Sequence, residues 1–166
     1  MGAMTVLRGE PLVAGEATGE VVVSDLPLSL WGGLDPETGE VIDRHHPLSG
    51  RSIAGLVFSI PCGRGSCSAS GVLLEAIRAG TGPSAVILSR ADPIIALGAI
   101  LAEELYGLVV PVVVLPEEDR RRIADRDTVR ITRDGTVLLQ PPAEVPLPRA
   151  TQAARSVPRP TDDGAS

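Results

Sequence analysis

The sequence predicts an α/β domain of β/β/α architecture, with a central sheet rich in parallel strands, a second β layer and two main helices. Three short apolar runs, at 56–60, 84–88 and 111–115, have the length and bounding residues of buried strands. Two segments of helical periodicity, at 68–79 and 92–106, separate these runs. Strands that alternate with helices favour parallel pairing through right-handed crossovers, which is the basis of this assignment.

The N-terminal part is expected to add strands to the second β layer. Residues 5–23 are predicted to form one or two strands, because apolar runs at 12–14 and 19–23 flank the segment Gly-Glu-Ala-Thr. Residues 24–55 follow as a long stretch without periodicity, rich in Gly, Pro, Asp and His. Loops of this length are unusual inside a compact domain and are often functional, so this stretch is a candidate functional segment.

Both helices carry end signals in the sequence. The first is predicted over 68–79, with Gly80 as its C-terminal stop. The second begins with Asp92 as the N-cap and Pro93 at the first helical position, and it ends before Gly107. Each helix is therefore expected to start directly after a strand of the central sheet.

A hairpin and a change of composition close the chain. Residues 128–132 and 136–139 are predicted to be strands joined by a turn that contains Asp134-Gly135, a favoured hairpin dipeptide. After Gln140 the chain is rich in Pro, Arg, Ala, Thr and Asp. We therefore predict one domain over 1–140 and a disordered tail over 141–166.

Composition excludes several classes of function. The chain has 166 residues, a net charge of −6 and only 2% aromatic residues, which argues against nucleic-acid binding. No apolar run approaches the ~20 residues of a membrane span, so no membrane partner is expected. Its two cysteines, Cys62 and Cys67, fit a cytoplasmic protein with free thiols. They cannot complete a structural zinc or iron–sulfur site alone, so no metal is expected on this chain.

The segment GRGSCSAS, residues 63–70, is the candidate site. One interpretation is structural, since serine is a good N-cap and Gly-Arg-Gly makes a tight turn. The functional interpretation uses the same geometry, because free amides at a helix N-terminus bind carboxylate or phosphate, and Arg64 could add a bidentate contact. A serine in such a turn could also serve as a general base. The glycine spacing fits neither nucleotide-binding signature.

Other polar residues have simpler interpretations. The pair His45-His46 is expected to order its loop or contact a substrate, and Asp43 is expected to be a turn residue. Trp31, in a glycine-rich segment, is expected to be a lid or interface contact. The run 120–122, three arginines after three acidic residues, is expected to be a solvated face.

The segment 27–75 resembles the small subunit, or swivel domain, of the aconitase X family. Three motifs carry the resemblance in order: Pro-Leu-Ser-x-x-Gly-Gly-x-Asp-Pro-x-Thr-Gly from Pro27, Asp-x-x-His-Pro-Leu from Asp43, and Gly-Arg-Gly-Ser from Gly63. The resemblance extends over about 5–140. It implies a swivelling β/β/α domain and a dehydratase activity, on cis-3-hydroxy-L-proline in bacterial members or mevalonate 5-phosphate in archaeal ones.

The resemblance also implies that two subunits contribute different groups to the reaction. An aconitase-X-type large subunit would be the partner and would hold an iron or iron–sulfur centre through its cysteines, with no cofactor on this chain. The substrate would be a small carboxylate. Ser66 matches the serine base, and Ser70 matches a second hydroxyl of the motif, so either could be the base. The substrate-binding residues would be Arg64, Gly65, Cys67, Ser68 and Ser70.

One departure from the family pattern bears on the substrate. Archaeal members resemble Gly-Ser-Thr-Val-Gly-Ser and bacterial ones Gly-Ser-Cys-Ser-Gly-Ser, whereas residues 65–70 are Gly-Ser-Cys-Ser-Ala-Ser. This favours the hydroxyproline type over a phosphorylated substrate. Ala69 would crowd an anion site if its backbone needed a positive φ. The alternative function is therefore a non-catalytic anion-binding or assembly module of the same fold.

A second resemblance concerns the fold alone. Residues 96–139 are similar to the phosphohistidine swivel domain of phosphoenolpyruvate-utilising enzymes. Aligning residues 102–105 with that family's motif places Leu97 at the position of its reactive histidine. Leucine cannot carry a phosphoryl group, so the similarity supports a swivel fold and argues against phosphotransfer.

Overall fold

The structure is a computed structural model and describes residues 3–140. Eight strands lie in this range: β1 (Thr5–Arg8), β2 (Glu10–Val13), β3 (Ala17–Val23), β4 (Val57–Ser59), β5 (Ala85–Leu88), β6 (Val112–Val114), β7 (Thr128–Ile131) and β8 (Thr136–Gln140). The helices there are α1 (Leu30–Gly33), α2 (Ala69–Ala79), α3 (Pro93–Tyr106) and α4 (Glu117–Arg120). The predicted tail, 141–166, lies outside the described residues.

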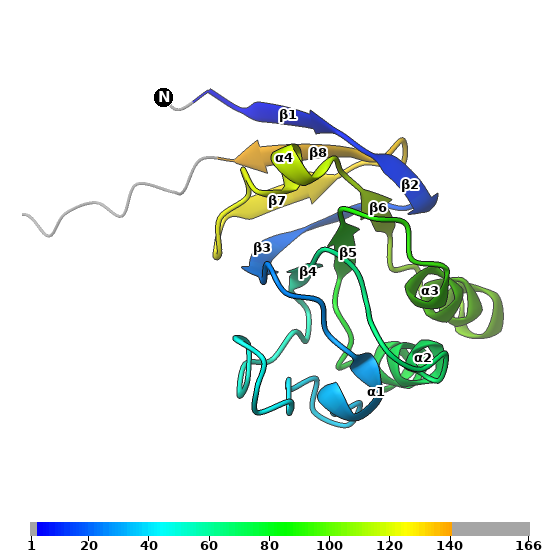
Figure 1. Ribbon diagram of the computed structural model, residues 1–166. Helices are drawn as coiled ribbons and strands as arrows, with labels where there is room; N and C mark the ends of the chain where they lie inside the picture. The colour runs from blue at the N-terminus through cyan, green and yellow to red at the C-terminus, as the bar shows by residue number, and fades with distance from the viewer. Residues whose placement is uncertain (1–2, 141–166) are drawn as a thin grey trace, which may run out of the picture.

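The strands form a sheet that folds into two layers, in the order β1-β8-β7-β3-β4-β5-β6-β2. Strands β4, β5 and β6 are parallel, as predicted. β3 joins them in parallel and β2 pairs with β6, although the N-terminal strands were expected in the second β layer. The strands β1, β8 and β7 are antiparallel and fold over them as the second β layer, while α2 and α3 cover the opposite face (Figure 1). This is the predicted β/β/α architecture.

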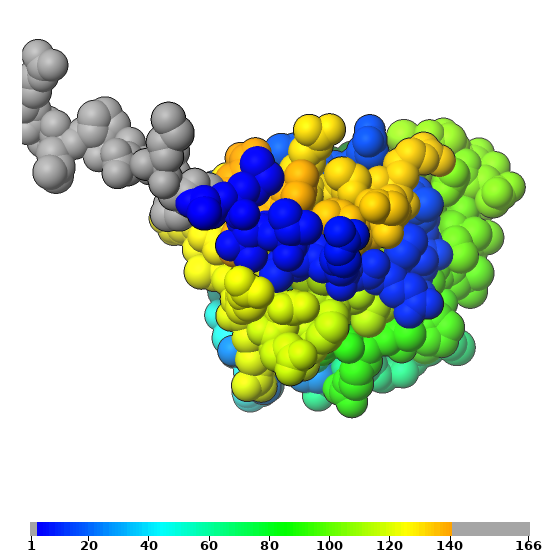
Figure 2. Space-filling model, turned by 90° about the horizontal axis from the view of Figure 1, so that it is seen from above, coloured from blue at the N-terminus to red at the C-terminus, as the bar shows by residue number. Residues whose placement is uncertain are grey.

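Two cores follow from the pleat of the central sheet, because successive side chains of a strand point to opposite faces. One row across the parallel strands joins Val22, Phe58, Val86 and Val112 by register, and it packs toward the helices. The neighbouring residues of the same strands pack against Leu7, Val129 and Val137 of the second β layer. Figure 2 shows the outer face of that layer, where β1 lies beside β8.

The helix ends confirm the predictions from the sequence. Gly80 and Gly107 cap α2 and α3 in the left-handed conformation, with φ of 80° and 66°. The Asp92 side chain caps α3 by accepting hydrogen bonds from the amides of Ile94 and Ile95. Glycine is favoured at both C-terminal caps, Gly80 and Gly107, because it has no Cβ to clash at positive φ.

The N-terminal segment differs from the prediction of one or two strands. Residues 5–23 form three strands, and β1 and β2 diverge to opposite ends of the sheet order. Gly9 lies at the divergence, where a Cβ would collide with the Val113 side chain and come within 2.9 Å of the Gly135 carbonyl oxygen. Because the backbones approach so closely here, the single residue Gly9 can separate β1, which pairs with β8, from β2, which pairs with β6.

The stretch 24–55 is ordered, although it contains only one short helix, α1. Isolated bridges between Leu34 and Val41 and between Glu40 and Ser52 fold it back on itself. A further bridge, between Leu28 and Gly63, joins it to the turn after β4. The stretch is therefore in contact with the segment that contains the candidate site.

Arg120 corrects the prediction of a solvated face for 120–122. Its side chain is fully buried, whereas Arg121 and Arg122 are exposed. The guanidinium donates to Glu117, to Asp25 Oδ1 at 3.0 Å and to the Ser24 carbonyl oxygen at 3.2 Å. These hydrogen bonds offset its desolvation. The hydrogen bonds from Arg120 also lower the pKa of Glu117 to about 2, against the opposing effect of burial.

Candidate functional site

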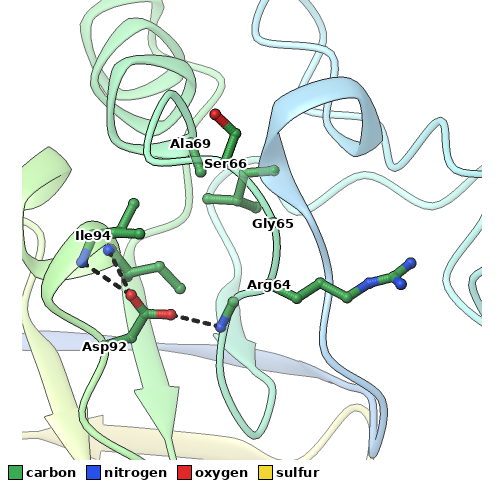
Figure 3. Close-up of a pocket in the computed structure, with 9 residues that line it drawn as sticks. Arg64, Gly65, Ser66, Ala69, Asp92 and Ile94 are labelled. Carbon is green, nitrogen blue, oxygen red and sulfur yellow. Dashed lines mark hydrogen bonds between the residues drawn. The ribbon is translucent and has the colours of Figure 1, made fainter.

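The candidate site lies where β4 and β5 lead into α2 and α3. A pocket of about 140 Å³ opens between the two connecting turns. Ligands of α/β sheets commonly bind at this carboxyl edge of the strands. The backbone segment 63–66 forms part of the wall, and the residues Leu30, Ala69, Asp92, Ile94 and Ile95 complete it (Figure 3).

Gly65 sets the path of the turn before α2. Its φ is +89°, which a residue with a side chain rarely adopts. A Cβ on Gly65 would also lie 2.8 Å from Ser29 Oγ, and the Arg64 amide donates to the Leu28 carbonyl oxygen at 3.2 Å. The turn therefore packs closely against segment 28–30 and requires glycine at this position.

The turn before α2 is open, although the first amides of α2 itself donate to carbonyl oxygens of residues 66–68. Ser68 is the N-cap by position, but its hydroxyl makes no capping hydrogen bond. Ser66 Oγ instead accepts from the Ser68 amide at 3.1 Å, and Ser70 Oγ donates to the Cys67 carbonyl oxygen at 2.9 Å. Within residues 3–140, no group accepts a hydrogen bond from the amides of Gly65, Ser66 or Cys67. Three successive amides at the positive end of a helix can bind an anion.

Asp92 closes the neighbouring helix. Its Oδ1 accepts from the amides of Ile94 at 2.9 Å and Ile95 at 3.1 Å. Its Oδ2 accepts from the Gly63 amide at 2.8 Å, and these bonds are the dashed lines in Figure 3. The sequence predicted Asp92 as an N-cap only, so its contact with the turn before α2 is new.

Arg64 is placed differently from its neighbours in the turn. Its side chain points away from Asp92 and Ile94 in Figure 3. One guanidinium nitrogen lies 3.3 Å from Asp43 Oδ2, and the Arg64 side chain is 60% exposed. The predicted contact of Arg64 with a substrate therefore requires its side chain to leave Asp43 and turn toward the pocket.

The histidines differ from each other. His46 is buried, with Nε2 3.2 Å from the Leu26 carbonyl oxygen and Nδ1 accepting from the Leu48 amide at 3.2 Å. Its ring thus joins two segments of the 24–55 stretch, in agreement with a loop-ordering role. His45 is exposed.

The described residues do not fit a metal centre. Cys67 is exposed, and Cys62 is half-buried with its Sγ 3.1 Å from an Arg90 guanidinium nitrogen. Within residues 3–140, no group of three or more His, Cys, Asp or Glu side chains is placed to hold a metal ion. We therefore derive no chemical step through a metal on these residues.

Comparison with known families decides the identity of the domain. A family model, the Aconitase X swivel domain, matches residues 6–139. The chain belongs to this family. The match covers the described strands, both main helices and the whole candidate site, so the resemblance drawn from the three sequence motifs is confirmed.

Relatives with two kinds of name are similar to this aconitase X swivel domain. It is 56% identical over 106 residues to the cis-3-hydroxy-L-proline dehydratase of Pseudomonas aeruginosa and 52% over 112 residues to that of Hypocrea jecorina. These matches cover 64% and 68% of the chain, but the chain spans only 18% and 19% of the two dehydratases. The phosphomevalonate dehydratase small subunit of Methanothermobacter thermautotrophicus is 49% identical over 105 residues, which are 63% of this chain and 76% of that subunit.

A solved structure supports the fold of the swivel domain. The crystal structure of Thermococcus kodakaraensis aconitase X in its holo form superposes with a TM-score of 0.75 at 35% identity, covering 82% of this chain and 99% of that one. Separately, no helix within residues 3–140 is both long and apolar enough to cross a lipid bilayer.

The structure brings together some of the predicted site residues and adds others. Arg64, Gly65 and Ser66 line the pocket, whereas Cys67 and Ser68 lie in the turn just before α2 and Ser70 lies in the first turn of α2. Their roles in binding and catalysis stay predictions. Sequence reasoning missed the apolar wall made by Leu30, Ile94 and Ile95. In the sequence these residues give only an ordinary core signal.

Proposed function

We propose that this swivel domain is the small subunit of a two-chain aconitase-X-type hydro-lyase that dehydrates a small hydroxy acid, with cis-3-hydroxy-L-proline favoured over mevalonate 5-phosphate. The observation that carries the proposal is the open turn before α2, where Ser66 stands among three amides without internal partners in the described chain. The family match supports the reaction class.

The amides of Gly65, Ser66 and Cys67 bind the substrate carboxylate in this proposal. Backbone N–H groups at a helix N-terminus stabilise a negative charge without any side-chain rearrangement. Arg64 adds a second contact: its guanidinium leaves the exposed ion pair with Asp43 and binds the substrate carboxylate instead. Such an exchange costs little, because exposed ion pairs contribute about 0–1 kcal/mol.

Ser66 acts as the general base. As an alkoxide stabilised by the nearby amides, its oxygen takes the proton from the carbon that bears the carboxylate. The electron pair of that C–H bond forms the new double bond, and the hydroxyl on the neighbouring carbon leaves with its bonding pair. The departing hydroxide is protonated to water, and release of the proton that Ser66 received restores the alkoxide, so the substrate loses one water overall.

The partner supplies the metal chemistry in this proposal. The described residues offer no ligand set for a metal, so we place the expected iron centre in the large subunit. When bound there, it would supply Lewis-acid polarisation of the leaving hydroxyl. The chain is then inactive alone, since its own residues provide only the base and the carboxylate contacts.

Two observations favour the hydroxyproline substrate. The hydroxyproline dehydratases are 52% and 56% identical to this chain over the matched region, against 49% for the archaeal small subunit. The pocket is small and partly apolar, with Leu30, Ile94 and Ile95 in its wall. Such a wall suits the methylene groups of a five-membered ring.

Ala69 no longer supports the non-catalytic alternative. It is the first residue of α2, and among the described non-glycine residues only Arg126 has a positive φ. A methyl group at position 69 therefore causes no backbone strain. The two-chain enzyme is thus the better-supported function.

The test is turnover by the assembled enzyme with Ser66→Ala and Ser70→Ala as a matched pair. The chain is co-expressed with an aconitase-X-type large subunit from the same genome, purified without oxygen, and assayed with both substrates. We expect dehydration of cis-3-hydroxy-L-proline, and a loss in kcat of at least about 100-fold for Ser66→Ala. Ser70→Ala should lose less than about tenfold, because the Ser70 hydroxyl donates to Cys67 within its own helical turn.

Each part of the proposal has its own contrary result. Normal turnover by Ser66→Ala would exclude that serine as the base, and a larger loss for Ser70→Ala would reassign the role. Turnover of mevalonate 5-phosphate alone would overturn the substrate assignment. A stable complex that dehydrates neither substrate, with carboxylate still bound, would favour the anion-binding module.

A further inference from the structure

Asp92 is the one carboxylate in the wall of the pocket, and its two oxygens accept three backbone amides within the described chain. Its residue surface is only 9% exposed. A buried carboxylate is stable only when hydrogen bonds replace its hydration, and these amides do so. Asp92 is therefore an anion that the protein itself supplies at the N-terminus of α3.

The third amide belongs to the other helix connection. Gly63 starts the turn that leads to α2, and its amide lies 2.8 Å from Asp92 Oδ2. A Cβ on Gly63 would lie 2.8 Å from the same oxygen, so the carboxylate and the turn are in direct contact. Only Arg64 separates Gly63 from Gly65, where the free amides begin. Movement at Gly63 would therefore reorient the amide of Gly65.

Ser66 depends less on this contact. Its hydroxyl oxygen is held from the other side by the Ser68 amide, at the start of α2. The Ser66 carbonyl oxygen also accepts from the Ala69 amide at 3.1 Å. The base and the first part of the anion site thus have separate supports: the base is held from the start of α2, and residues 63–65 are held by Asp92 together with segment 28–30.

We propose that Asp92 is a positioning residue for the anion site, because its Oδ2 fixes Gly63 and thereby the amides that receive the substrate carboxylate. The inference rests on the proposed function, since it assigns Asp92 to the binding step of that reaction. Asp92 touches no reacting atom. By occupying the α3 N-terminus itself, it also leaves the α2 N-terminus as the place for an external anion.

The test uses two substitutions of Asp92 that keep the cap of α3 and remove the oxygen that accepts from the Gly63 amide. In Asp92→Asn, the amide oxygen can still cap α3, but the NH₂ group cannot accept from Gly63. In Asp92→Ser, the hydroxyl can cap α3 and has no second oxygen for Gly63. The control is Asp134→Asn, because Asp134 also accepts a backbone amide, in the β7–β8 hairpin of the other layer.

Three measurements are made on each variant. Hydrogen exchange of the Gly63 amide is followed in the full chain, and kcat and KM are measured for the assembled enzyme. The dissociation constant of pyrrole-2-carboxylate, a planar five-membered-ring carboxylate, is measured with the same assembly. We expect exchange at Gly63 to accelerate, and KM and the dissociation constant to rise about tenfold, as loss of one charge-assisted hydrogen bond allows. A change in kcat of less than about threefold is expected, because carboxylate binding is shared by ground and transition states.

The outcomes separate this inference from the proposed reaction. Faster exchange at Gly63 with an unchanged dissociation constant would reduce Asp92 to a helix cap and overturn the inference, as would unchanged exchange in both variants. If the wild-type assembly dehydrates neither substrate, exchange and binding still decide the role of Asp92. If wild type does not bind pyrrole-2-carboxylate at all, the anion site and the inference both fall.

Discussion

Two helices begin side by side at the carboxyl edge of the central sheet, and the segments that lead into them differ in how their backbone amides are satisfied. The N-terminus of α3 is closed, because Pro93 has no N–H and Asp92 accepts the next two amides. The turn before α2 is open, because the amides of residues 65–67 lack partners in the described chain, whereas the first amides of α2 itself donate to residues 66–68.

This difference shows how one local motif can serve either stability or binding. A helix N-terminus leaves amides without partners within the helix, and the residue before it decides whether the chain or a ligand satisfies them. A carboxylate on a short side chain satisfies them permanently. A glycine-rich turn with serines leaves them available. The two connections thus divide the tasks of holding the fold and binding the ligand.

The largest expected effect comes from a substitution that distorts the turn before α2. Gly65→Ala places a methyl group at φ +89° and 2.8 Å from Ser29 Oγ, so the turn must rearrange. We expect turnover to fall about 100-fold, since a displacement near 1 Å at a catalytic site has that effect. The control is Gly80→Ala at the other end of α2, where φ is +80° and, apart from chain neighbours, no atom of residues 3–140 lies within 4 Å of the added methyl group.

The control variant separates strain from site geometry. Both substitutions carry the backbone cost of a positive φ, about 1–2 kcal/mol, and should lower the urea midpoint similarly. Only Gly65→Ala should lose activity per folded molecule. Equal losses of activity in the two variants would mean that the open turn has no special role.

A smaller effect is expected when the caps themselves are removed. Asp92→Ala should lower the free energy of unfolding by about 1–2 kcal/mol, because it loses the α3 cap and the Gly63 contact together. Ser68→Ala should change it by less than about 0.5 kcal/mol, since the Ser68 hydroxyl makes no cap bond that could be lost. Urea unfolding followed by circular dichroism measures both. A Ser68→Ala loss as large as that of Asp92→Ala would contradict the comparison.

The smallest effect concerns Arg120, which contacts the end of β4 just before the connection to α2. Arg120 reaches the residues after β3 and the end of β4, and its hydrogen bonds hold the pKa of Glu117 at about 2 rather than 4.5. The folded state thus favours the carboxylate. Its contribution to stability is complete above about pH 4.5 and is lost as the pH falls toward about 2.

Glu117→Gln should therefore unfold with a shallower dependence on pH between about 4.5 and 2 than wild type does. The effect is modest, because the Glu117 side chain is 39% exposed and solvent screens the pair. The control is Glu118→Gln, an exposed neighbour outside the ion pairs of residues 3–140. Parallel pH profiles for Glu117→Gln and wild type would contradict the assignment.

Local signals predicted most of the fold. Helix starts and stops at Asp92, Gly80 and Gly107 depend on a few neighbouring residues, and each is found where expected. The division of 5–23 into three strands was missed, because it depends on the approach of Gly9 to Val113 and Gly135. Contacts between residues so distant in the chain leave no periodicity to detect.

The sequence indicated the segment 63–70 as a candidate site, but it did not indicate the contact of Asp92 with that segment. The glycines and serines of 63–70 indicate exposed amides by their type alone. The contact of Asp92 with Gly63 spans 29 positions, and the burial of Arg120 depends on partners 95 positions or more away as well as on Glu117. Charge runs in a sequence do not show which member enters the interior.

The divergence of β1 and β2 at Gly9 has a consequence for how the protein is made. Among the strands of residues 3–140, β1 pairs only with β8, in a register that places Thr5 opposite Leu139. During synthesis the first strand therefore waits without its partner until the end of the described domain has emerged. The second β layer is completed last, after the parallel strands and helices can already have packed, so the site-bearing half of the molecule can form before the chain has closed over its other face.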